Sequence, residues 1–224
     1  MREKTAILCS LFLLLGLSAC ARNQEGIASL SRDGIAPYEL SEENKSLLQA
    51  FGLSGQNSQI LVFKAPKEAV SMNFHVYCLG EDKAWERIDG GGIMRGWTDG
   101  EDGKCLEGLF TMQLKEDYAI EFHISDSGSS ATYESAPVSW PHELPAKTWT
   151  FLQEFQKIEL NTEIPVAILS YTNENGLSSS RLEDYFDPEG IENPDLVQAV
   201  TLEFSDKQLL EEASASQQAD KAQQ

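Results

Sequence analysis

The chain has 224 residues, with 17 Lys and Arg against 36 Asp and Glu and a formal net charge of −19 at neutral pH. Its length suffices for one sizeable hydrophobic core. A surface with this net negative charge repels nucleic acid and anionic lipid headgroups, and we therefore expect the folded surface to bind neither. The sequence carries no P-loop, no Gly-x-Ser-x-Gly elbow and no His-Glu-x-x-His helix, and we expect neither a cofactor nor one of these catalytic sites.

The first 19 residues are arranged like a secretory signal. Arg2 and Lys4 precede an uncharged, leucine-rich run over Thr5–Gly16, and small residues follow it. The apolar run is shorter than the roughly 20 residues that a helix needs to span a bilayer. We therefore expect residues 1–19 to be removed on export.

The four residues Leu17-Ser18-Ala19-Cys20 resemble the lipobox of bacterial lipoproteins. The resemblance implies a diacylglyceryl thioether on the Cys20 sulfur and signal cleavage between Ala19 and Cys20. The mature protein would then be anchored to the lipid bilayer by acyl chains such as palmitate, on the extracytoplasmic face of the cell membrane. Its net charge would be −20, because two basic residues and one acidic residue leave with the signal. An ordinary signal peptide followed by a chance cysteine is the alternative.

Two cysteines, Cys78 and Cys105, remain after Cys9 leaves with the signal and Cys20 takes lipid. An even pair in an exported domain is compatible with a disulfide. Two free thiols that pack as small apolar groups are the equal alternative.

The mature chain divides into three parts by composition. Residues 20–37 are rich in small polar residues and predict a flexible tether. Residues 38–206 are expected to form a single, monomeric domain, and residues 207–224 are expected to form a disordered tail.

A short helix is predicted at the start of the domain, over Ser41–Phe51. Ser41 is a suitable N-cap and Gly52 a suitable stop. Leu47, Leu48 and Phe51 form its apolar stripe.

After this helix the apolar period changes to two, which predicts short strands separated by turns. Asp89-Gly90-Gly91-Gly92 is expected to end one of them, and Thr148–Leu160 fits a strand or a helix. A single helical turn is predicted within Leu177–Phe186. The fold class predicted is mainly β, an antiparallel β-sandwich with one N-terminal helix. The expected strands are Ile60–Phe63, Met72–Cys78, Ala84–Ile88, Leu106–Leu114, Tyr118–Ile124, Ala131–Trp140, Thr148–Leu160, Pro165–Tyr171 and Gln198–Phe204.

The order of these pieces resembles a set of small, uncharacterised lipoproteins of Gram-positive gut bacteria. The similarity covers roughly Ile60–Lys207. It rests on the strand Ser71–Cys78 followed by a Trp-centred strand and a glycine run, and on the later stretches Tyr185–Glu189 and Ala199–Ser205. This resemblance implies no activity.

His75 and His123 both fall on the polar side of their predicted strands. If those strands pair, the two imidazoles and Glu121 form a weak candidate zinc site. The alternative, which we favour, is that no metal binds and that these are ordinary surface residues.

Of the four tryptophans, Trp97 is the best candidate for binding a ligand or partner, because it lies in a polar, Gly-rich stretch. Core packing is the better explanation for at least two of the four, which also include Trp85, Trp140 and Trp149.

The sequence favours a non-enzymatic binding or accessory module of the cell envelope, with an unknown envelope protein or ligand as its partner. Two alternatives stay open. One is a hydrolase of envelope glycans or peptides that uses carboxylates such as Glu183, Asp184 and Asp187. The other is an assembly subunit of a membrane complex.

Overall fold

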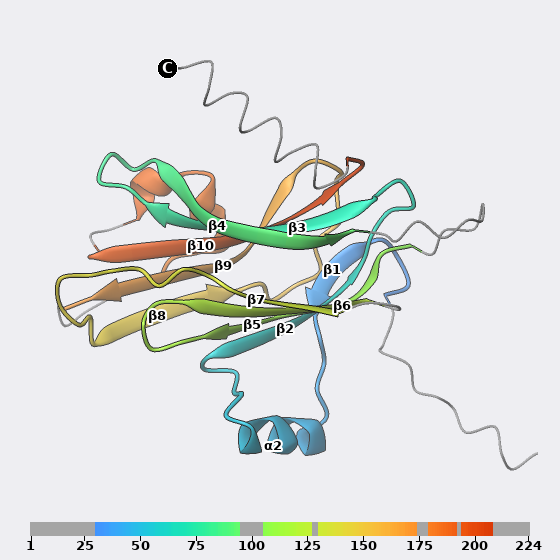
Figure 1. Cartoon of the computed structure of the whole chain (residues 1–224), viewed down its shortest axis with the longest axis horizontal. Coiled ribbons are helices and arrows are strands. Elements are labelled where there is room, and N and C mark those ends of the chain that lie inside the picture. Colours follow the sequence, from blue (N-terminus) through green and yellow to red (C-terminus); the bar gives the residue numbers. More distant parts are fainter. Residues whose placement is uncertain (1–29, 95–104, 127–129, 174–178, 192–193, 208–224) are drawn as a thin grey trace, which may run out of the picture.

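The computed structural model describes residues 30–94, 105–126, 130–173, 179–191 and 194–207. They form ten strands in two five-stranded antiparallel sheets, stacked as two layers (Figure 1). The first sheet has the order β1-β2-β5-β6-β7, and the second sheet has the order β4-β3-β10-β9-β8. The prediction of a mainly β, antiparallel sandwich is confirmed.

The strands of the first sheet are β1 Gly34–Pro37, β2 Ser58–Lys64, β5 Glu107–Leu114, β6 Ile120–Asp126 and β7 Ser130–Glu134. The strands of the second sheet are β3 Ser71–Leu79, β4 Trp85–Met94, β8 Ala146–Phe151, β9 Glu163–Thr172 and β10 Leu196–Ser205.

The core lies between the two sheets, because successive side chains of a strand point to opposite faces. Phe74 of β3 has its ring centroid 4.3 Å from that of Phe122 and 6.2 Å from that of Phe110, both on the first sheet. All three side chains are almost completely buried. Aromatic rings from both layers therefore interlock at the centre of the sandwich.

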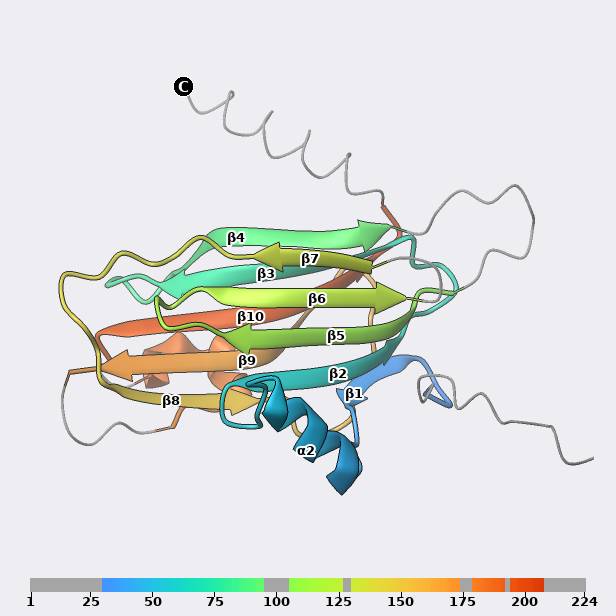
Figure 2. The same ribbon diagram turned by 60° about the horizontal axis from the view of Figure 1, so that its bottom comes forward.

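The N-terminal helix, α2, runs over Glu42–Ala50. As predicted, Ser41 caps it, since its hydroxyl accepts a hydrogen bond from the Asn44 amide at 3.2 Å. Gly52 follows the helix with a positive φ of 79°, a backbone conformation that glycine adopts more readily than other residues do. The apolar stripe, however, is not covered: Leu47 is 58 % exposed and Phe51 is 74 % exposed. Figure 1 shows why, because α2 lies apart from the two stacked layers, and in Figure 2 it is in front of the strands.

The predicted tether is shorter than expected at its C-terminal end. Gly34–Pro37 forms the edge strand β1, which pairs with β2. Ile35 of this strand is completely buried and joins the main core. The few large apolar side chains of this polar stretch give little sequence signal for a strand, and the pairing of β1 with β2 is visible only in the fold.

The glycine run does not end a strand, contrary to the prediction. Strand β4 continues through Gly90–Gly92, with a register shift opposite Val76/Tyr77. A Cβ atom on Gly91 would lie 2.9 Å from ring atoms of both Phe74 and Tyr133. Glycine is needed here so that Tyr133 of the first sheet can pack closely against the second sheet.

Two further segments differ in length or type from the prediction. Thr148–Leu160 contains no helix, and its strand part is the end of β8. Strand β7 ends at Glu134, well before Trp140. The predicted helical turn exists as the 3-10 helix η2, Leu182–Tyr185, and a second one, η3, spans Pro188–Gly190.

Candidate functional site

Several residues singled out in the sequence lie outside the described residues. They are Ala19 and Cys20 at the expected cleavage and lipid-attachment position, and Trp97. The structure therefore leaves the anchor and the Trp97 binding site as predictions.

The three weak candidate metal ligands are not brought together. His75 lies on β3 of the second sheet, whereas Glu121 and His123 lie on β6 of the first sheet, so the pairing of their strands that we considered does not occur. Glu121 Oε1 and His123 Nε2 do meet at 2.7 Å, but His123 is half exposed and Glu121 also pairs with Lys115. The weak candidate grouping of His75, Glu121 and His123 is therefore not formed in the structure.

Cys78 and Cys105 are both free thiols in the structure. Cys105 precedes Leu106, whose carbonyl accepts a hydrogen bond from the Ala65 amide, at the end of the sandwich where β3 begins. Cys78 lies near the other end of β3. The strand from Ser71 to Cys78 is roughly 24 Å long at about 3.4 Å per residue, and the two cysteines lie toward its opposite ends. A disulfide requires Cα atoms within roughly 7 Å, so the candidate bridge is not formed.

We expect both thiols to be alkylated in the unfolded, unreduced protein. In the folded protein Cys78 should react slowly, because burial, with a smaller effect from the Glu86 charge, raises the pKa of its thiol to about 11. Intact mass and peptide mapping after alkylation, with and without reductant and denaturant, measure this. A mass gain at Cys78 and Cys105 that appears only after reduction would contradict it.

His75 instead meets two carboxylates on the face of the second sheet that points away from the core. Its Nε2 atom lies 3.4 Å from Glu203 Oε2, and one ligating atom each of His75, Glu163 and Glu203 lies within 4.8 Å of the others. His75 is 3 % exposed, and the Glu203 side chain is 18 % exposed. The three residues come from β3, β9 and β10, which are neighbours only in the folded sheet.

Three hydroxyl groups hold Glu163 in place. Tyr77 Oη, Tyr185 Oη and Thr201 Oγ1 each donate a hydrogen bond to its carboxylate at 2.7 Å. Burial alone would raise the pKa of Glu163, but these bonds and the nearby His75 outweigh it, so the pKa lies below its ordinary value of 4.5. Glu163 is therefore ionised at neutral pH and is poorly suited to act as a general acid.

The η2 segment brings Tyr185 to this cluster by packing on the outer face of the second sheet. Trp85 stacks on Tyr185 with ring centroids 5.5 Å apart, and its Nε1 atom donates to the Tyr185 carbonyl at 2.9 Å. Trp140 and Trp149 pack against the main core instead. Packing thus accounts for all three tryptophans that the structure describes.

A separate concave site lies beside α2. This site, here named the α2 pocket, has a volume of about 430 Å³ and is open on one side; it is lined by α2, its two flanking connections, the end of β1, β2, the end of β8 and the segment after it. Gln59 Nε2 of β2 donates a hydrogen bond to the Leu152 carbonyl at 2.8 Å, which joins the wall from the first sheet to the wall from the second. Its volume is within the range of small-ligand pockets, about 300–1,000 Å³.

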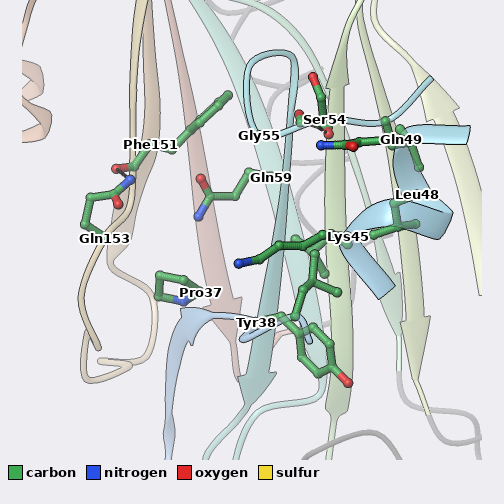
Figure 3. Close-up of a pocket in the computed structure, with 14 residues that line it drawn as sticks. Pro37, Tyr38, Lys45, Leu48, Gln49, Ser54, Gly55, Gln59, Phe151 and Gln153 are labelled. Carbon is green, nitrogen blue, oxygen red and sulfur yellow. Dashed lines mark hydrogen bonds between the residues drawn. The ribbon is translucent and has the colours of Figure 1, made fainter. Parts of the chain in front are cut away.

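The lining of the α2 pocket mixes apolar and polar side chains (Figure 3). The Lys45 side chain extends from α2 into the space that faces Gln59, and its amine is 2.7 Å from Glu42 Oε1. The apolar lining includes Leu40, Leu48, Leu53, Ile60 and Phe151, and the polar lining includes Tyr38, Lys45, Gln49, Gln59 and Gln153. The pocket residues come from two segments that are far apart in the sequence, and nothing in the sequence pattern predicts that they meet.

No protein-family model, curated protein or solved structure matches this chain. Within the described ranges, no helix combines the length and the apolar character that crossing a bilayer requires. Function must therefore be inferred from the residues and their geometry.

Proposed function

We propose that the protein is a lipid-anchored binding module of the cell envelope, in which the α2 pocket holds the ligand. The lipobox-like residues Leu17–Cys20 support the anchor and its extracytoplasmic location. The described domain would project from the membrane, because its acidic surface is repelled by anionic headgroups.

The observation that carries the proposal is a ligand-sized pocket beside a helix whose apolar side chains have no cover. A nine-residue helix gains little stability by itself in water, and most helices in folded proteins are held by burial of an apolar face. Here α2 has no buried residue, and Leu47 and Phe51 face solvent. Apolar surface of this kind beside a concave site is typical of a binding surface.

The lining indicates the chemistry of the ligand. The amides of Gln59 and Gln153 already donate to backbone carbonyls, so what they offer a ligand is mainly their side-chain oxygens as acceptors. The Gln49 amide can donate and accept, and the single amine, Lys45, is already next to Glu42. A ligand that combines apolar surface with neutral hydrogen-bonding groups, as amide-bearing peptides or glycans do, fits this lining.

Photo-crosslinking in intact cells tests the proposal. A benzophenone amino acid at Gln49, which is exposed and lines the pocket, should give a discrete adduct on irradiation. The matched control position is Ser46, which is exposed on the same helix but does not line the pocket, and it should give little or none. Mass spectrometry distinguishes a small-molecule adduct from a partner protein.

Two results would contradict a ligand in this pocket. One is the absence of any adduct at Gln49, and the other is an equal yield of the same adduct at Ser46. A protein adduct confined to Gln49 would identify the ligand as part of an envelope protein, which keeps the proposal and defines the partner.

A further inference from the structure

The cluster of His75, Glu163 and Glu203 carries an inference that is independent of the α2 pocket. Glu163 and Glu203 are direct cross-strand partners on β9 and β10, and His75 is diagonal to Glu203 on β3. All three side chains therefore project from the three central strands of one sheet, close to the start of β9. Ligands on paired strands are held more rigidly than ligands on loops.

The charges of this cluster are unbalanced. Two carboxylates directly opposite each other on neighbouring strands repel and destabilise the pairing. Among the residues that the structure describes, Glu203 has one ion-pair partner, His75 at 3.4 Å, and no lysine or arginine pairs with Glu163. A bound cation would turn this repulsion into attraction.

Glu163 has one coordination position left. A carboxylate offers about four lone-pair sites. Tyr77 occupies one on Oε1, while Tyr185 and Thr201 occupy both on Oε2. The remaining site is on Oε1, and the three hydroxyls fix the orientation of the carboxylate in the way that outer hydrogen bonds fix metal ligands.

The imidazole of His75 is placed as a metal ligand would be. Its contact with Glu203, 3.4 Å, is long for a hydrogen bond. Zinc bonds of about 2.0–2.2 Å at tetrahedral angles hold two ligand atoms roughly 3.4 Å apart. The other ring nitrogen, Nδ1, is buried and has no hydrogen-bond partner among the described atoms. Only Nε2 therefore meets the carboxylates, and the ring is oriented by the packing around it rather than by a hydrogen bond at Nδ1.

We propose that His75, Glu163 and Glu203 bind one zinc ion. One nitrogen and two carboxylate oxygens suit zinc, whereas calcium and magnesium favour sites made only of oxygen. Three protein ligands leave a fourth position for water, and the partly exposed Glu203 is on the side from which the ion enters. The site is formed only in the folded sheet, so zinc also stabilises the fold.

Calorimetric titration of the detergent-purified full chain, stripped of metal with EDTA, tests this. We expect one zinc ion to bind, and Glu203→Gln and His75→Gln each to weaken binding by about tenfold or more. Glutamine has nearly the same size as glutamate and Glu203 is partly exposed, so the Glu203→Gln variant should fold. It therefore tests zinc binding even if His75→Gln does not fold. Cobalt in place of zinc should give tetrahedral visible bands without thiolate charge-transfer absorption.

His123→Gln is the matched control, because His123 and Glu121 form a similar but exposed pair on the first sheet. It should leave zinc affinity unchanged. Equal zinc affinity in the starting protein and Glu203→Gln, loss of binding in His123→Gln, or a cobalt–thiolate band would each overturn the assignment. Binding of calcium or magnesium but not zinc would overturn it as well.

Discussion

A Cys20→Ala variant is expected to carry no lipid, and once its signal is removed the protein is expected to disappear from the membrane fraction. The thioether that the lipobox implies needs the Cys20 sulfur, and alanine offers no nucleophile. Each buried methylene of an acyl chain contributes about 0.8 kcal/mol to membrane binding, so two chains anchor stably and their loss is complete rather than partial. Within the part of the chain that the structure describes, no helix replaces them.

Fractionation of cells, combined with metabolic labelling by a palmitate analogue, measures this effect. The control is Cys9→Ala, which removes a thiol from the apolar run of the signal and leaves Leu17–Cys20 intact. It should label and fractionate as the starting protein does. The anchor would be wrong if the Cys20→Ala protein were retained with a cleaved signal, or if the starting protein took up no label.

A Phe74→Ala variant is expected to lose about 3–5 kcal/mol of the free energy of unfolding, the range for large aromatic side chains removed from a core. Phe74 is 1 % exposed, and its ring contacts Phe110, Phe122 and Tyr133 of the opposite sheet at centroid distances of 4.3–6.2 Å. Its removal leaves a cavity between the layers that these rings cannot fill without breaking their own packing. For a domain of this size the thermal midpoint should fall by roughly 6–20 °C.

Urea unfolding followed by tryptophan fluorescence and circular dichroism gives the free energy. Phe51→Ala is the matched control, since the same side chain is removed from a position that is 74 % exposed, and it should change stability by less than about 0.5 kcal/mol. A loss below about 1 kcal/mol for Phe74→Ala, or equal losses for the two variants, would show that this aromatic cluster does not hold the sheets together.

The sequence alone determined the features that depend on local chemistry. The period-two alternation from Met72 to Cys78 reflects the apolar face that packs between the two sheets, so it was visible before the fold was known. The start and end of α2 were also predictable, because Ser41 and Gly52 act through hydrogen bonds and backbone angles within a few residues. The mainly β class follows from such short-range signals.

Only the tertiary structure decided which residues meet. His75 and Glu203 are 128 positions apart, and strand order, which alternation does not encode, makes them neighbours while it separates His75 from His123. The same holds for Leu47 and Phe51: their spacing shows an apolar face, but whether that face is covered depends on where the chain leaves β1 and enters β2. Local pattern fixes the conformation of each element and which side is apolar. Partners across the sheets are set by the register and order of strands, which result from packing the whole core at once.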